Sequence, residues 1–144
     1  YRMTDIAAAL GISQLSRLKK YVDIRNKLAK VYNRELISLP INLPIISEGI
    51  KSSYHLYVIR LDEKNPKVSK STMMNKFKKN NIGASFHYMP VYKHPYYVNL
   101  KKTNYKNLIN AEKYFSSAIS IPIYPTMKEK EQKKVIRVLK DTLS

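Results

Sequence analysis

Apolar positions at helical spacing dominate the first quarter of the chain. Residues 4–10 predict a short helix with Thr4 as its N-cap, and Gly11 is expected to interrupt it. A second helix is predicted from Ser13 to about Leu36, because apolar side chains recur near one stripe while the opposite face is charged. A helix of this length with a single apolar stripe can run along one domain or bridge two.

The next segments favour extended structure. Pro40 and Pro44 exclude a helix over residues 39–46 and leave an extended or edge-strand segment there. Residues 53–61 form the strongest predicted strand, since they are rich in aromatic and β-branched side chains that alternate along it.

A helix and a second strand are predicted after a polar turn. Ser69 or Ser71 can cap a helix that runs to about Asn80, and Gly83 is expected to close it with a positive φ. Residues 84–88 then fit a strand.

The last third of the chain begins with an aromatic loop. Residues 89–100 are punctuated by prolines and fit neither the helical nor the strand period. A helix is predicted over residues 107–117, a short strand over 118–121 stopped by Pro122, and an amphipathic helix over 127–143. With about three strands and no glycine-rich βα turn, the predicted fold class is α+β.

Composition sets outer limits on function. The 144 residues suffice for one domain with a hydrophobic core, and no apolar run approaches a membrane span, so a soluble, cytoplasmic protein is expected. Cysteine is absent, which excludes disulfides and thiolate sites. His55, His87 and His94 lack helical metal-ligand spacing, and no metal site is expected.

The net charge of +17 raises the question of an anionic partner. Of the 27 basic residues only six are arginine, the usual reader of bases and phosphates, and the lysines are spread along predicted helix surfaces. Three interpretations stay open: solvated lysine-rich faces, a surface suited to anionic nucleotide substrates, and a nucleic-acid-binding module.

Common catalytic motifs are missing from the chain. It contains no dinucleotide-binding, P-loop, nucleophile-elbow or zinc-protease motif. A strand that ends in His87 and Tyr88 and then turns at Pro90 would place a titratable ring and a phenol at a sheet edge, where both can bind sugar hydroxyls or a phosphate. The alternative is that both rings pack against the aromatic loop, in which Tyr92 is either a recognition residue or part of a lid.

Several runs of the sequence occur in an order that is typical of one enzyme family. They are Tyr1-Arg2-Met3-Thr4-Asp5-Ile6, Ala8-Ala9-Leu10-Gly11, Gln14-Leu15, Arg17-Leu18, Arg25, Ala29, Tyr32, Tyr54-His55-Leu56-Tyr57, Gly83, His87-Tyr88 with Pro90, Ala111-Glu112, and Ser120-Ile121-Pro122 with Tyr124-Pro125. Together they resemble the C-terminal part of the sugar-nucleotide aminotransferases of the DegT/DnrJ/StrS family, which use pyridoxal 5'-phosphate (PLP). The chain departs from the pattern at Ala7, where glutamine is usual, and at Lys19, where an acidic residue is common.

The resemblance implies a domain arrangement. It implies the small C-terminal domain of a fold-type I aminotransferase, with a mostly antiparallel sheet of about three strands, helices packed on it and a long helix before it. Residues 1–36 would be the interdomain segment and long helix, and residues 37–144 the small domain. The large PLP-binding domain, with the lysine that holds the cofactor, would lie upstream of Tyr1, so no catalytic residue is expected in this chain.

The resemblance also implies site residues and partners. Tyr1 and Arg2 would lie near the PLP phosphate of the neighbouring subunit in a homodimer, while His87, Tyr88, Pro90 and Tyr92 would bind the substrate. The expected reaction transfers an amino group, from glutamate, to a keto sugar nucleotide, and the spacing around His87 is most similar to the branch that acts on 4-keto-6-deoxy UDP-sugars. A PLP-dependent sugar dehydratase of the same family would look alike over these residues. The chain alone, without the lysine, is expected to be inactive and to bind no cofactor, and neither membrane nor nucleic acid is expected as a partner.

Overall fold

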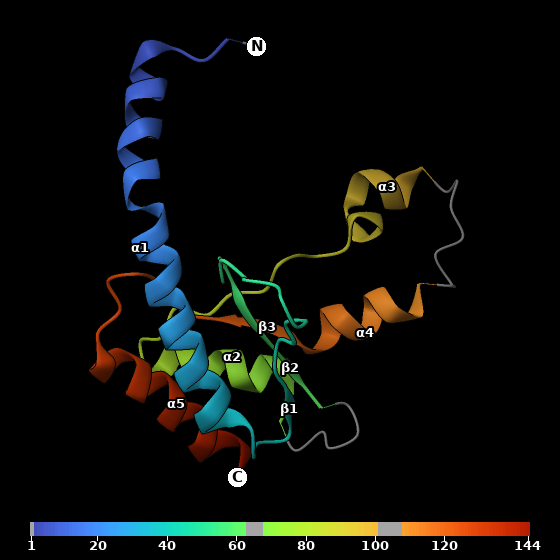
Figure 1. Cartoon of the computed structure of the whole chain (residues 1–144). Helices are drawn as coiled ribbons and strands as arrows, with labels where there is room; N and C mark the ends of the chain where they lie inside the picture. Colours follow the sequence, from blue (N-terminus) through green and yellow to red (C-terminus); the bar gives the residue numbers. More distant parts are fainter. Residues whose placement is uncertain (1, 63–67, 101–107) are drawn as a thin grey trace.

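The chain forms a small three-stranded sheet with helices packed on it. The computed structural model describes residues 2–62, 68–100 and 108–144. In chain order the elements are α1 (Asp5–Leu36), β1 (Ile41–Asn42), β2 (Tyr57–Leu61), α2 (Lys70–Lys79), the 3-10 helix η1 (Val91–Lys93), α3 (Pro95–Asn99), α4 (Ile109–Ser117), β3 (Ala118–Ile121) and α5 (Glu129–Leu143). The sheet is antiparallel with strand order β1-β2-β3, which confirms the predicted α+β class (Figure 1).

The first helix is continuous, and the predicted interruption at Gly11 is wrong. α1 runs for 32 residues from the Thr4 N-cap, whose hydroxyl accepts a hydrogen bond from the amide of Ala7. One glycine inside a helix costs only about 1 kcal/mol relative to alanine, which the helix-forming residues on both sides can offset. Ser13 does not begin a new helix, since its hydroxyl accepts a hydrogen bond from Arg17 at 3.1 Å instead.

The strands differ in part from the prediction. β2 begins only at Tyr57, because Tyr54 has a positive φ of 43° that takes it out of the extended region. The strand predicted over residues 84–88 reduces to one bridge between Ser85 and Ser120. The third strand is β1, within the segment between Pro40 and Pro44, and it pairs with β2 over two residues.

Helix ends follow the predicted caps with small shifts. Ser69 caps α2 by accepting a hydrogen bond from the amide of Thr72, as expected. The residue with positive φ after α2 is Asn81, at 52°, and not Gly83; asparagine tolerates this region better than most residues. The loop after Met89 contains η1 and α3, since Pro95 at the first turn of α3 presets a helical φ.

The core joins the end of α1 to the sheet and to α5. Tyr32 and Leu36 of α1, Ile59 of β2 and Leu139 of α5 have no exposed surface. Two long-range hydrogen bonds fix α1 in this place. The Tyr32 hydroxyl donates to the carbonyl oxygen of Pro122 at 2.8 Å, and the Gln132 amide donates to that of Leu28 at 2.8 Å. The outer half of α1, in contrast, extends away from the body of the fold (Figure 1), and every residue from 9 to 20 is exposed. The domain boundary predicted after residue 36 stays a prediction.

Candidate functional site

His87 is held at the edge of the sheet by β3. Ser85 and Ser120 exchange two backbone hydrogen bonds of 3.1 and 2.7 Å, which align the segment before His87 with β3. Nδ1 of His87 then lies 2.8 Å from the Ser120 hydroxyl oxygen. Because Ser120 is buried, this hydrogen bond fixes one ring nitrogen of the half-buried His87 and leaves Nε2 as the one that can meet a ligand.

Tyr88 stands against His87 and faces solvent. The two rings meet edge to face, with centroids 4.6 Å apart and an interplanar angle of 88°. Tyr88 is 77% exposed. Of the two alternatives that the sequence left open, packing of both rings against the aromatic loop therefore does not hold for Tyr88, whose surface is exposed.

Pro90 begins the turn that carries Tyr92. Pro90 immediately precedes η1, and its carbonyl oxygen accepts a hydrogen bond from the amide of Lys93. The Tyr92 hydroxyl donates to Oε1 of Glu112 at 2.7 Å, and Nζ of Lys93 lies 2.5 Å from Oε2 of the same carboxylate. These contacts tie the loop to α4.

The two hydrogen-bond donors of Glu112, Tyr92 and Lys93, determine the pKa shifts of this part of the site. The Lys93 ammonium, followed by the Tyr92 hydroxyl, lowers the pKa of Glu112 below its usual value. The hydrogen bond to Glu112, followed by removal from water and the negative charge of that carboxylate, raises the pKa of Tyr92 to about 12. Tyr92 is therefore a neutral phenol at any physiological pH.

A second cluster lies one turn further along α4, at Phe115, whose ring is 5.2 Å from Nζ of Lys93. Nζ of Lys70 donates to the carbonyl oxygen of Phe115 at 2.5 Å and lies 4.6 and 4.4 Å from the ring centroids of Phe86 and Phe115. Removal from water lowers the pKa of Lys70. Phe86 and Phe115 also meet edge to face, so the residue before His87 is packed against α4.

Two surface hollows of similar size lie on the described part of the fold, one beside this cluster and one on other elements. One, of about 460 Å³, is lined by Lys70, Met74, Phe86 and Phe115 among others. The other, of about 420 Å³, lies between α1 and α5. Neither hollow is lined by His87, Tyr88 or Tyr92.

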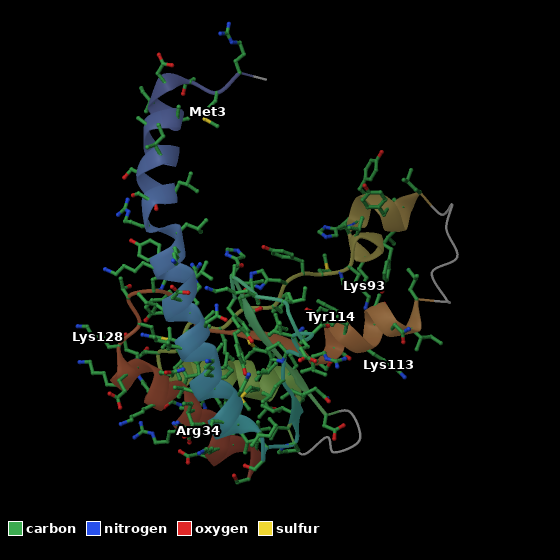
Figure 2. The ribbon with its side chains drawn as sticks, viewed as in Figure 1. Met3, Arg34, Lys93, Lys113, Tyr114 and Lys128 are labelled. Carbon is green, nitrogen blue, oxygen red and sulfur yellow. The ribbon has the colours of Figure 1, made fainter. Side chains whose placement is uncertain are left out.

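Arg2, one of the two predicted cofactor contacts, precedes the first turn of α1. Tyr1 is outside the described residues, and Arg2 is exposed. Figure 2 shows Met3 near the outer end of α1 and Lys93, the last residue of η1, on a different part of the molecule. A guanidinium in this position has the right chemistry for a phosphate. Among the described residues no group of three histidine or acidic side chains could hold a metal ion. No helix in the described ranges is long and apolar enough to cross a membrane.

Sequence reasoning missed three residues of this site. Ser120, Lys70 and Glu112 touch the predicted residues or their neighbours, but they lie 16 to 33 positions away from them in the sequence. Glu112 and Ser120 belong to runs that resemble the aminotransferase family. Nothing in the sequence pointed to Lys70 as a site residue, because a lysine at the start of a helix is usually on the surface.

The fold defines the structural class of this chain. It is a small α+β domain with an antiparallel sheet, preceded by a long helix of which only the C-terminal half packs on the domain. Solved sugar aminotransferases contain this arrangement. PseC of Helicobacter pylori, an aminotransferase involved in the biosynthesis of pseudoaminic acid, is 27% identical with a TM-score of 0.87, over 99% of this chain and 38% of that one. The sugar aminotransferase Spr1654 of Streptococcus pneumoniae, described as putative and solved in its PMP form, is 26% identical with a TM-score of 0.88, over 98% of this chain and 35% of that one.

The sequence comparisons agree with the fold. The model of the DegT/DnrJ/EryC1/StrS aminotransferase family matches residues 1–140. The spore coat polysaccharide biosynthesis protein SpsC of Bacillus subtilis is 36% identical over 96% of this chain and 36% of its own length. The chain therefore belongs to the DegT/DnrJ/EryC1/StrS aminotransferase family. It spans 36–38% of the length of the curated relatives it matches.

Proposed function

We propose that these residues are the C-terminal part of a PLP-dependent aminotransferase that moves an amino group from glutamate to a keto sugar nucleotide. The reaction would serve surface polysaccharide or glycan biosynthesis in the cytoplasm. The observation that carries the proposal is the His87–Tyr88 pair, fixed on β3 through Ser120 in a chain whose family match covers residues 1–140.

The side chains have separate roles in this proposal. His87, with Nδ1 taken by Ser120, offers Nε2 to the substrate, and the exposed Tyr88 offers its hydroxyl and ring face. Pro90 sets the direction of the turn, and Tyr92 contributes its phenol from η1. Hydroxyl, imidazole and ring groups of this kind suit a sugar linked to a nucleotide.

The cofactor would be held mostly by other polypeptide. PLP, when bound, supplies an electron sink that stabilises the carbanion formed during amino-group transfer. The donor set of this chain fits only a phosphate contact, made by Arg2 together with Tyr1. The lysine that binds the cofactor would lie upstream of Tyr1, and the catalytic step would depend on it.

The exposed apolar side chains of the outer half of α1 support a further part of this proposal, namely that another polypeptide surface packs against this helix. Six large apolar side chains on it or just before it are 51–85% exposed, which is unusual for so short a stretch. They are Met3, Ile6, Leu10, Ile12, Leu15 and Leu18. Contact with the rest of the enzyme and with a second subunit in a homodimer would cover them.

A domain exchange tests the proposed function. The matched C-terminal region of SpsC, which is 36% identical, would be replaced by these 144 residues. The chimera is expected to take up PLP, accept an amino group from glutamate and aminate at least one member of a panel of 4-keto-6-deoxy nucleotide sugars. His87→Ala is expected to abolish amination of the sugar, whereas Tyr96→Phe, at an exposed ring on α3, serves as the matched control. A chimera that takes the amino group from glutamate but aminates no sugar would contradict the proposal.

A further inference from the structure

An ammonium group from α2 satisfies the C-terminal end of α4. The last four carbonyl groups of an α-helix have no partner within the helix, and Phe115 carries one of them, since α4 ends at Ser117. Nζ of Lys70, the first residue of α2, donates to this carbonyl oxygen at 2.5 Å. The helix dipole also favours a positive charge at this end. Lys70 therefore connects the start of α2 to the end of α4.

The same ammonium lies over two aromatic rings. Nζ of Lys70 is 4.4 Å from the centroid of the Phe115 ring and 4.6 Å from that of Phe86, and the two rings meet edge to face. An aromatic face attracts a cation, and the attraction is stronger where the cation is partly removed from water. Lys70 is half-buried, and this removal from water lowers its pKa. Phe86, although 45% exposed, is thus held against α4 by a charged group as well as by ring contact.

Both partners of the His87–Ser120 hydrogen bond connect to this ammonium. On one side, Phe86 immediately precedes His87 in the sequence. On the other side, α4 passes into β3 without a loop, since Ser117 ends the helix and Ala118 begins the strand that carries Ser120 (Figure 1). The ammonium therefore lies where it can set the position of the imidazole relative to the hydroxyl group.

We propose that Lys70 is a positioning residue that keeps the His87 imidazole on the Ser120 hydroxyl. Its ammonium holds Phe86 at the junction of α4 and β3, so that Nδ1 of His87 stays 2.8 Å from the Ser120 oxygen and Nε2 is left for a ligand. The backbone bridge between residues 85 and 120 aligns the two segments but does not fix the rotation of the ring. The consequence for the substrate rests on the proposed function, whereas the effect of Lys70 on His87 does not.

The first test uses the chain without any ligand. Long-range ¹H–¹⁵N spectra at about pH 8, where an ordinary imidazole is neutral, report the tautomer of each histidine, and His87→Ala assigns the signals of that ring. Lys70→Met keeps the apolar stem but removes the ammonium, so His87 is expected to change from one dominant tautomer to a mixture. Lys70→Arg keeps a cation that can donate to a carbonyl group and lie over a ring, and it is expected to restore the single tautomer.

The matched control is another lysine of α2. Lys78 is exposed, and Lys78→Met is expected to leave the His87 signals unchanged. Phe86→Leu is a second, independent variant, because it removes one ring under the ammonium while the donor to the Phe115 carbonyl stays in place, and it is expected to give the same mixture of tautomers. Circular dichroism shows which variants are folded. A single His87 tautomer in folded Lys70→Met or in folded Phe86→Leu overturns the proposal.

The second test places Lys70→Met in the SpsC chimera. We expect KM for the nucleotide sugar to rise about tenfold with a smaller change in kcat, because a ground-state contact made by His87 is weakened. Lys70→Arg is expected to bring KM back to within about twofold of the parent chimera. An unchanged KM in Lys70→Met contradicts the positioning role. If the ligand-free His87 signals behave as expected but the parent chimera aminates no sugar, the proposed function fails while the positioning of His87 by Lys70 stands.

Discussion

Nδ1 of His87 lies 2.8 Å from the hydroxyl oxygen of Ser120, across 33 positions of sequence. Ser120 is buried in β3, whereas His87 sits on a segment that pairs with β3 through a single bridge. The orientation of the imidazole thus depends on one hydroxyl group. This dependence can be measured directly.

Ser120→Ala is expected to release the His87 ring without unfolding the domain. The lost hydrogen bond should lower the free energy of unfolding by about 1 kcal/mol, a typical net value for one such bond. Long-range ¹H–¹⁵N spectra should show His87 changing from one dominant tautomer to a mixture. Ser116→Ala is the control, since that hydroxyl donates to the Lys113 carbonyl within α4. Unchanged imidazole signals in Ser120→Ala would show that Ser120 does not orient His87.

Tyr32→Phe tests the bond between the long helix and the segment after β3. The Tyr32 side chain is fully buried, and its hydroxyl donates to the carbonyl oxygen of Pro122. Removing it leaves that acceptor without this donor, so the free energy of unfolding in urea should fall by about 1–3 kcal/mol. Tyr96→Phe, at a ring 69% exposed, should change stability by less than about 0.5 kcal/mol. Equal stability of Tyr32→Phe and the parent would contradict a structural role for this hydroxyl.

The Glu35–Lys140 ion pair should make stability depend on pH. Lys140 of α5, followed by Arg34, donates to the Glu35 carboxylate of α1 and lowers its pKa below the usual 4.5. A carboxyl whose pKa is lowered by folding stabilises the folded state above the unfolded pKa, and this contribution is lost as the pH falls through the folded pKa. Glu35→Gln should therefore be less stable than the parent at pH 7, and the difference should shrink as the pH falls below 4.5, the usual pKa of this carboxyl.

Glu129→Gln is a control variant that also neutralises a carboxylate but leaves the contact between α1 and α5 intact. Glu129→Gln removes a pair whose two side chains are 78% and 73% exposed and belong to one helix. Its effect at pH 7 should be smaller than that of Glu35→Gln, because exposed pairs within a helix contribute little. A larger effect for Glu129→Gln in urea denaturation would show that the α1–α5 pair does not hold these helices together.

The elements that sequence predicted well are those determined by local signals. β3 is a short apolar run stopped by Pro122, and α2 starts at a serine that caps it. α5 has a strongly amphipathic pattern, and its predicted start was off by only two residues. In these segments propensity, caps and burial favour the same structure, so the sequence alone is sufficient.

The features that escaped prediction depend on distant partners. Local chemistry marks Gly11 as a helix breaker, yet α1 passes through it. The pattern of residues 84–88 suits a strand, but only Ser85 finds a partner on β3. The contacts of Glu112 with Tyr92 and Lys93 arise only once α4 lies beside η1, and no spacing rule connects positions 19 and 20 residues apart across a loop.

The lysines of this chain are expected not to form a specific Schiff base with PLP. Lys70 is half-buried and its pKa is lowered, but its Nζ donates to the Phe115 carbonyl oxygen and lies over two aromatic rings that favour the ammonium form. A nucleophilic amine must instead be neutral and reach the cofactor aldehyde. Titration of the chain with PLP should therefore give no stoichiometric visible absorbance band, and borohydride reduction followed by peptide mass spectrometry should find only scattered, substoichiometric adducts. Lys70→Ala should leave that pattern unchanged. One adduct per chain located at a single lysine would contradict the inference that the cofactor lysine lies outside these residues.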